Sequence, residues 1–213
     1  MKKTLLLLAA VIGFSFAAEA QLRPGFRLGA NYSTMTGRDV PDNVYKYRLS
    51  YHGGVILNFT MGEIFAIQPE ILYSSKGFAY GNATHTVPGT SVPVQRQGGV
   101  KMNYIDIPVL FRTQAGALYF ELGPQLSYLL STKSDVNDPA VGNVDPRPNK
   151  GDLTAWDYGV AAGVGLDIYG AQLGLRYNLG LNPVEGNNRY LNTSPLKHSN
   201  FMLTIGYMVP SNR

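Results

Sequence analysis

The sequence has no cysteine, and charged residues occupy only 15% of its 213 positions, against roughly 25% in ordinary soluble proteins. Without cysteine, the chain can form neither a disulfide scaffold nor a thiolate metal site. Beyond residue 20, no apolar run approaches the roughly 18 residues that a membrane-spanning helix needs. The net charge of +4 is spread thinly along the chain, which is weak support for nucleic-acid binding. We therefore expect no nucleic-acid partner, and the low charge needs another explanation.

The first 20 residues have the features of a secretory signal peptide. Two lysines precede an apolar stretch from Leu5 to Phe16, and Ala18-Glu19-Ala20 fits the small-x-small cleavage pattern. The apolar stretch is too short for a membrane anchor, and no cysteine stands at the cut to carry a lipid. We therefore predict that residues 1–20 are removed after export and that residues 21–213 form a single domain.

The remaining chain predicts strands throughout, because apolar residues alternate with polar or small ones at period two. Stretches with helical periodicity are missing from it. The strands exceed the roughly 5–6 residues usual in soluble sheets and suit tilted strands that cross a bilayer. The eight predicted strands are Pro24–Ser33, Ser50–Met61, Glu63–Ser75, Val100–Thr113, Ala117–Ser131, Asp152–Asp167, Ala171–Gly180 and Asn200–Val209.

Long and short connections alternate along this series of strands. Tight turns follow the second, fourth and sixth strands, and long connections follow the other strands up to the seventh. The predicted long connections are Thr34–Leu49, Lys76–Gly99, Thr132–Gly151 and Leu181–Ser199. This asymmetry is typical of outer-membrane barrels, which have tight periplasmic turns and long outer loops. We predict an eight-stranded antiparallel up-and-down transmembrane β-barrel in the outer membrane, with both termini periplasmic. A secreted β-sandwich or lipocalin-like barrel is the alternative, but it has no reason to place every long loop at one end.

The two faces of the predicted strands differ in polarity. One face is apolar and carries no charge at mid-strand, as contact with lipid requires, because a Lys or Arg there would cost roughly 2–4 kcal/mol. Every mid-strand charge falls on the opposite face, which we expect to line the lumen. The predicted lumen network consists of Arg27, Glu70, Asp106, Arg112, Glu121, Asp157 and Arg176. Buried charges are tolerated when paired, so we predict ion pairs that plug the lumen and a protein that is not a porin.

Outward-facing aromatic residues are expected in two bands, one near each end of the barrel, where amphipathic rings meet lipid headgroups. Three prolines lie inside predicted strands and are unfavourable there. Pro69, Pro108 and Pro124 each lack the backbone N–H that would donate a hydrogen bond to the neighbouring strand. We expect bulges or irregular pairing at these prolines, with a one-residue change of face beyond them.

Signals for catalysis or cofactor binding are few. His52 lies on a predicted lumen position near the outer rim and is the basis of the alternative that the protein is a rim-sited hydrolase or acyltransferase, with Ser50 and Asp42 nearby in sequence. Gly159, Gly163 and Gly165 alternate in a strand with no following helix, which predicts close packing rather than a phosphate loop. We therefore predict no enzyme activity, no cofactor and no metal.

The expected partners are lipids of the outer membrane and a protein bound through the outer loops. Lipopolysaccharide is included because the predicted loop Lys76–Gly99 holds two basic residues and no acidic one. A structural or interaction role in the membrane is the function that these features favour. Loop-mediated binding, or an accessory role in secretion, is the alternative.

Several segments resemble the PorT-type outer-membrane β-barrel family, which is typical of Bacteroidota. These segments are GFRLGANYST (Gly25–Thr34), IQPEILYSSKGFAY (Ile67–Tyr80), MNYIDIPVLFR (Met102–Arg112), FELGPQLSYLLS (Phe120–Ser131), WDYGVAAGVGLDI (Trp156–Ile168) and LGLRYNLGL (Leu173–Leu181). The resemblance covers nearly all of the predicted mature chain and includes all three prolines. It implies a small outer-membrane barrel, mostly without an assigned activity, in a family whose founding member is tied to a secretion and gliding machinery.

Overall fold

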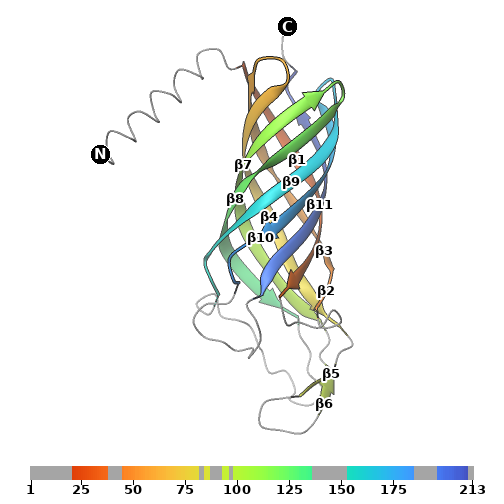
Figure 1. Cartoon of the computed structure of the whole chain (residues 1–213). Helices are drawn as coiled ribbons and strands as arrows, with labels where there is room; N and C mark the ends of the chain where they lie inside the picture. The colour runs from red at the N-terminus through yellow and green to blue at the C-terminus, as the bar shows by residue number, and fades with distance from the viewer. Residues whose placement is uncertain are drawn as a thin grey trace, which may run out of the picture.

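A computed structural model describes residues 21–37, 45–81, 84–86, 93–95, 98–135, 153–184 and 196–210 (Figure 1). The predicted signal peptide, residues 1–20, lies outside the described residues, so its cleavage stays a prediction. Among the described residues, no helix is long and apolar enough to span a membrane.

Eight long antiparallel strands form the body of the molecule. They are β1 (Gln21–Thr36), β3 (Arg48–Met61), β4 (Phe65–Tyr80), β7 (Gly99–Ala115), β8 (Leu118–Ser134), β9 (Trp156–Ile168), β10 (Ala171–Gly180) and β11 (Lys197–Met208). Three short strands, β2 (Tyr45–Lys46), β5 (Thr84–Thr86) and β6 (Pro93–Gln95), belong to the long connections. Each of the eight long strands overlaps a strand predicted from the alternation.

Each long strand pairs with its neighbours in the chain, and β1 pairs with β11, so the sheet closes into an eight-stranded antiparallel barrel. Moving from partner to partner around the barrel from Leu22 on β1 returns to Tyr32 on the same strand, ten residues further along. This stagger is about 33 Å along a strand, against about 38 Å across eight strands. The strands therefore tilt by about 40°, within the range of closed barrels. A barrel of this size has an interior that side chains can fill.

The tight turns lie at one end of the barrel, together with the beginning of β1 and the end of β11 (Figure 1). Tyr169 and Gly170 form one of these turns, and both have positive φ, 53° and 90°. Positive φ at both central residues is the geometry of a two-residue turn whose twist matches that of the flanking strands. The long connections leave the opposite end, which we call the loop end.

Several strands extend further toward the loop end than the alternation predicted, whereas β9 begins at Trp156 rather than at Asp152. β4 continues to Tyr80 rather than ending at Ser75, and β8 continues to Ser134 rather than Ser131. Lys76, predicted to lie in a loop, therefore belongs to β4. The prediction failed here because apolar side chains such as Phe78 and Met102 point inward at this end. Inward residues are therefore no longer polar, and the alternation stops while the strands continue.

The prolines interrupt the pairing without shifting it. Pairing of β3 with β4 is interrupted opposite Pro69, yet Ile56 pairs with Glu70 and Phe59 with Ile67 in one register. The expected irregular pairing is present, but the expected change of face beyond the prolines is wrong.

The register of β7 and β8 shifts instead near the loop end. Asn103 pairs with Ser131, whereas Tyr104 pairs with Leu129, so Leu130 is an extra residue in β8. This bulge exchanges the inward and outward positions of β8 beyond Leu130. No proline or glycine lies next to Leu130 in the sequence, so the bulge could not be located from the sequence.

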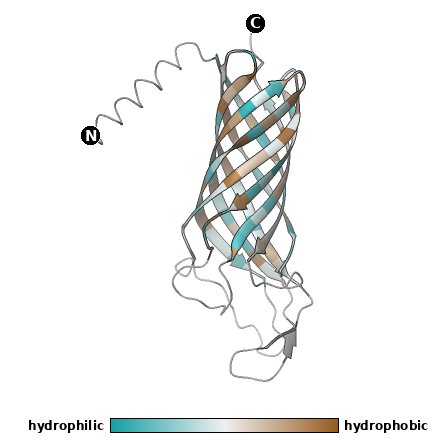
Figure 2. Ribbon diagram, in the orientation of Figure 1, coloured by the Kyte–Doolittle hydropathy of each residue, from teal (hydrophilic) through white to brown (hydrophobic). Residues whose placement is uncertain are grey.

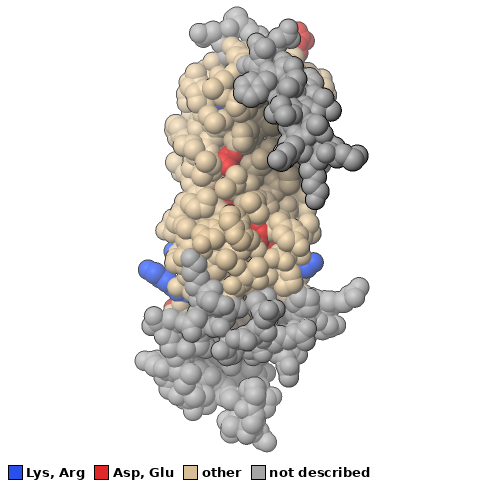
Figure 3. Space-filling model, turned by 90° about the vertical axis from the view of Figure 1, so that its left-hand side faces the viewer, with Lys and Arg blue, Asp and Glu red and all other residues tan. Residues whose placement is uncertain are grey.

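Hydrophobic and hydrophilic residues alternate along the strands (Figure 2), and the burial of their side chains gives the outer and inner faces of the wall opposite polarity, as predicted. Every residue predicted to face lipid is exposed or half-buried, and every polar residue predicted to face the lumen is buried. The outer wall is mostly uncharged in the view of Figure 3, and lysine and arginine atoms gather near the loop end. Large exposed apolar residues on this wall include Phe26, Leu28, Val55, Ile71, Phe111, Leu122, Leu175, Leu203 and Ile205.

Aromatic residues contact one another around the wall near the loop end. Tyr128 and Trp156 have ring centroids 4.8 Å apart, as do Tyr177 and Phe201. Such rings suit the headgroup level of a bilayer.

Candidate functional site in the barrel lumen

Two arginines and two glutamates occupy the centre of the lumen. Arg27 on β1 lies 3.1 Å from Glu70 on β4 and 3.6 Å from Glu121 on β8. Arg176 on β10 donates from Nη1 and Nη2 to the two oxygens of Glu70, at 2.8 and 2.9 Å, and from Nε to Glu121 at 2.7 Å. We call these four residues the central quartet.

The central quartet is electrically balanced and closed to solvent, since none of its members is more than 5% exposed. Each carboxylate lies between two guanidinium groups, and the bidentate contact of Arg176 with Glu70 is among the stronger forms of this pairing. Ions buried to this degree are stable only when paired and hydrogen-bonded. The quartet therefore ties together four strands that are distant in sequence.

A second ion pair lies nearer the tight turns. Arg112 donates to Asp167 at 2.8 Å, and Gln172 donates to the same carboxylate oxygen at 3.1 Å. The guanidinium carbon of Arg112 also lies 3.8 Å from the centre of the Tyr119 ring, a cation–π contact. The sequence had predicted Arg112 as a lumen residue but had placed Asp167 at the end of a strand.

Glycines make room for this packing, as the strand pattern predicted. A Cβ atom on Gly165 would lie 2.5 Å from the ring of Tyr119, and one on Gly174 would lie 2.3 Å from its hydroxyl oxygen. A Cβ atom on Gly163 would lie 2.9 Å from the Glu121 carboxylate. At these positions the inner faces of β9 and β10 carry no side chain, which leaves room for the side chains of Tyr119 and Glu121 on β8.

A third ion pair lies on the loop side of the quartet. Lys76 donates to Asp106 at 2.7 Å and is 3% exposed. The sequence had predicted Asp106 as part of the network but missed Lys76. The signal was available, because Lys76 continues the inward series of Glu70, Leu72 and Ser74 at period two.

Asp157 differs from the other predicted lumen carboxylates. Its side chain is buried, but its Oδ1 has no hydrogen-bond partner in the described part of the chain, and no cation there lies within ion-pair distance. Five of the seven predicted residues form one hydrogen-bonded network. Arg112 joins the central quartet through Gln68, which accepts from Arg112 at 3.4 Å and donates to Glu70 at 2.8 Å. Asp106 pairs with Lys76 instead, and Asp157 remains apart.

An apolar cluster fills the lumen at the loop end. Its members are at most 6% exposed, and Tyr104 among them shares a hydrogen bond of 3.0 Å with His198. The cluster consists of Met35, Phe78, Val100, Met102, Tyr104, Leu129, Val184 and Leu196. It was not predicted, because its residues lie where the alternation of polar and apolar residues has ended.

His52 is buried in the barrel and is hydrogen-bonded through both ring nitrogens. Its two ring nitrogens lie 2.8 Å from Asn31 Oδ1 and 3.1 Å from Thr204 Oγ1, and the ring is 3% exposed. Ser50 donates to the backbone oxygen of Ser75 at 2.6 Å instead of approaching His52. Asp42 lies outside the described residues. In the neutral ring, one nitrogen thus donates to Asn31 and the other accepts from Thr204.

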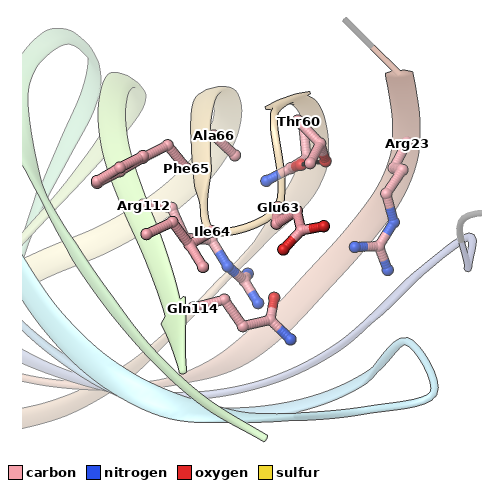
Figure 4. A pocket seen from close by; sticks show the side chains of 9 residues that line it. Arg23, Thr60, Glu63, Ile64, Phe65, Ala66, Arg112 and Gln114 are labelled. Carbon is pink, nitrogen blue, oxygen red and sulfur yellow. Dashed lines mark hydrogen bonds between the residues drawn. The ribbon is translucent and has the colours of Figure 1, made fainter. Parts of the chain in front are cut away.

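A cavity of about 220 Å³ opens at the tight-turn end of the lumen. Arg23, Glu63, Arg112 and Gln114 project toward this space (Figure 4). Arg112, which is paired with Asp167, is among the residues that line this cavity, which we call the vestibule. In the part of the chain that the structure describes, no group of three or more His, Asp or Glu side chains could hold a metal ion.

A closed antiparallel barrel with an apolar outer wall and a lumen filled by paired charges defines a transmembrane β-barrel of the outer-membrane type. The sequence matches the family described as outer membrane protein beta-barrel domain over residues 16–186, and the chain belongs to this family. This family description does not specify the PorT-type group, so the resemblance to that group stays a prediction.

Solved structures of small outer-membrane barrels are similar in fold at low sequence identity. Neisserial surface protein A is 12% identical, with a TM-score of 0.49 over 86% of this chain and 96% of that one. The attachment invasion locus protein Ail of Yersinia pestis, solved with the heparin analogue sucrose octasulfate, is 11% identical, with a TM-score of 0.44 over 88% of this chain and 99% of that one. The outer-membrane protein AlkL, solved in DMPC bilayers, is 12% identical, with a TM-score of 0.38 over 89% and 92%. Comparison with curated proteins gave no match.

Proposed function

We propose that this protein is a sealed outer-membrane barrel with a structural or interaction role, neither a porin nor an enzyme. The observation that supports this proposal is the continuous filling of the lumen. From the tight turns to the loop end, the lumen holds the Arg112–Asp167 pair, the central quartet, the Lys76–Asp106 pair and the apolar cluster.

Each of these layers opposes the passage of ions for a physical reason. An ion in transit would separate charges that are at most 7% exposed, and breaking a buried pair costs about 3–5 kcal/mol. It would then meet the apolar cluster, where no group replaces its hydration shell. The proposal thus rests on the filled lumen, which leaves no open path for ions, and not on a selectivity filter.

Conductance in planar bilayers tests the sealed lumen. We expect purified wild-type protein to insert without producing a stable, large open channel. A variant with all four members of the central quartet changed to serine is the matched control, since it keeps the wall and removes the longest charged side chains from the lumen. A stable large conductance of the wild-type protein, equal to that of this variant, would overturn the proposal.

The proposed orientation places the tight turns and both termini in the periplasm and the loop end outside the cell. The alternation of short and long connections supports it, since outer-membrane barrels have short periplasmic turns. The chain has no cysteine, so single introduced cysteines report accessibility cleanly. Tyr169→Cys, in an exposed tight turn, should resist a membrane-impermeant maleimide on intact cells, and Lys46→Cys, at the loop end, should react. The reverse pattern would invert the orientation.

The interaction role is assigned to the loops, because the wall contacts lipid and the lumen is filled. Deletion of residues 82–97 leaves β4 and β7 intact and removes most of the longest predicted connection. Cross-linking in native outer membranes should then lose a neighbouring protein that the full chain captures. If the deletion variant captures the same neighbouring proteins as the full chain, this loop does not bind a protein partner. The enzymatic alternative predicts that His52→Gln abolishes a hydrolytic activity, and the engaged ring of His52 argues against this outcome.

A further inference from the structure

A small cavity lies inside the lumen on the loop side of the central quartet. Gly159 on β9 and Gly180 on β10 are direct cross-strand partners and both line this cavity. Because neither carries a side chain, the layer between Asp157 and Asn178 is left incompletely filled. The cavity of about 10 Å³ has room for one particle of the size of a water molecule.

Three residues that line this cavity carry a side-chain oxygen that accepts no hydrogen bond from the described chain. These oxygens are Oδ1 of Asp157, Asn178 and Asn200, and the three side chains are at most 7% exposed. Asn178 and Asn200 are direct cross-strand partners. The amide nitrogen of Asn178 already donates to Gln125 at 2.8 Å, so the oxygen of Asn178 is the atom left for a ligand. A buried acceptor without a partner is costly, and these three acceptors border one space.

The same layer of the lumen has an excess of negative charge. Among the described residues, the central quartet has as many arginines as glutamates, and Arg112 balances Asp167. The layer at the cavity instead holds two buried carboxylates, those of Asp106 and Asp157, and one buried ammonium, that of Lys76. Lys76 also lines the cavity, but it donates to Asp106 at 2.7 Å. An unbalanced buried charge is costly, so this layer needs one further positive charge.

We propose that this cavity binds one monovalent metal cation of the size of sodium, with Oδ1 of Asp157, Asn178 and Asn200 as its protein ligands. A single positive charge makes the lumen neutral, whereas a divalent ion would leave a positive excess, and calcium takes about 6–8 oxygen ligands. A water molecule could donate to two of the oxygens but would leave the charge unbalanced. Carboxylate and amide oxygens suit a hard cation, and His198 supplies the one imidazole among the residues that line the cavity. The cation explains why Asp157 is buried without an ion-pair partner.

Urea unfolding from lipid vesicles tests the site when sodium chloride is compared with choline chloride at equal ionic strength. Choline is too large for a cavity of this volume. A ligand that binds the folded state alone raises the folding equilibrium constant about tenfold for each tenfold rise in its concentration above the dissociation constant. We therefore expect the wild-type unfolding midpoint to rise by about 0.5–1.4 M urea for each tenfold rise in sodium. Unfolding opens the lumen, so the equilibrium reports binding even if the folded barrel exchanges the ion slowly.

Three variants separate the site from a general effect of salt. Asp157→Asn keeps the shape of the side chain and removes its charge, so it should abolish the response to sodium and, in choline chloride, be as stable as wild type or more stable. Asn200→Leu loses no hydrogen bond of the described chain and should weaken sodium binding at least about tenfold. Glu63→Gln, at an exposed position beside a tight turn, is the matched control and should keep the wild-type response.

The outcomes that contradict the proposal are distinct. Equal wild-type midpoints in the two salts would overturn it and would mean that a proton neutralises Asp157. A response to sodium that Asp157→Asn retains would place the cation elsewhere. A larger response to potassium, or to calcium at the same concentration, would overturn the assignment to a monovalent ion of the size of sodium. None of these outcomes depends on the conductance of the barrel, so the cation site and the sealed lumen are tested separately.

Discussion

Removal of one arginine from the central quartet should destabilise the whole barrel. Arg176 contacts both glutamates of the quartet at 2.6 to 2.9 Å and is 2% exposed. Arg176→Met keeps much of the side-chain length and removes the charge, so Glu70 and Glu121 are left with Arg27 as their shared cation. Loss of one partner from a buried ion pair costs about 3–5 kcal/mol, and two carboxylates lose a partner here.

The single tryptophan of the chain reports this loss. Trp156 lies on the outer wall and is 50% exposed, so unfolding from lipid vesicles into water changes its fluorescence. In urea, slopes of about 1–3 kcal/mol per molar convert the expected loss into a fall of at least about 1 M in the unfolding midpoint. Arg23→Met is the matched control, because Arg23 lies in the open vestibule and donates a hydrogen bond to a backbone oxygen. The control should lose less than about 1 kcal/mol.

A second change tests the assignment to charge balance. Combining Arg176→Met with Glu121→Gln leaves Arg27 and Glu70 as one neutral pair, so part of the lost stability should return. If Arg176→Met costs less than about 1 kcal/mol, or if the second change only adds to the loss, the quartet is not the coupled unit that its geometry indicates.

Two further predictions concern the wall. Leu203→Arg, at the middle of the lipid-facing surface, should cost about 2–4 kcal/mol in the same urea assay, whereas Leu181→Arg at the loop end should cost about 0–1 kcal/mol; equal costs would mean that the apolar wall does not contact lipid. Gly165→Ala should cost about 1–3 kcal/mol, because its new Cβ would lie 2.5 Å from Tyr119, whereas Gly53→Ala meets nothing closer than 3.6 Å and should leave the midpoint almost unchanged.

Much of the fold could be predicted because a bilayer imposes a strict local rule. Residues such as Leu203 and Ile205 must be apolar where lipid is the solvent, and Thr204 between them must not contact it, so face and strand are visible along the chain. The rule ends where the strands leave the bilayer. Apolar side chains such as Phe78 point inward there, so the prediction ended β4 at Ser75 and also missed Lys76, which still follows the inward series at period two.

Where polar and apolar residues alternate, the sequence by itself determined the strands, the inward and outward faces, and the side chains that enter the lumen, because these properties follow from alternation within one segment. Only the tertiary structure decided which charges pair. Arg176 and Glu70 are 106 positions apart, and they meet because eight strands close with a stagger of ten residues. The pairing of Lys101 on β7 with Lys133 on β8 likewise depends on the bulge at Leu130. Register is set by the packing of the whole barrel, and no single strand contains that information.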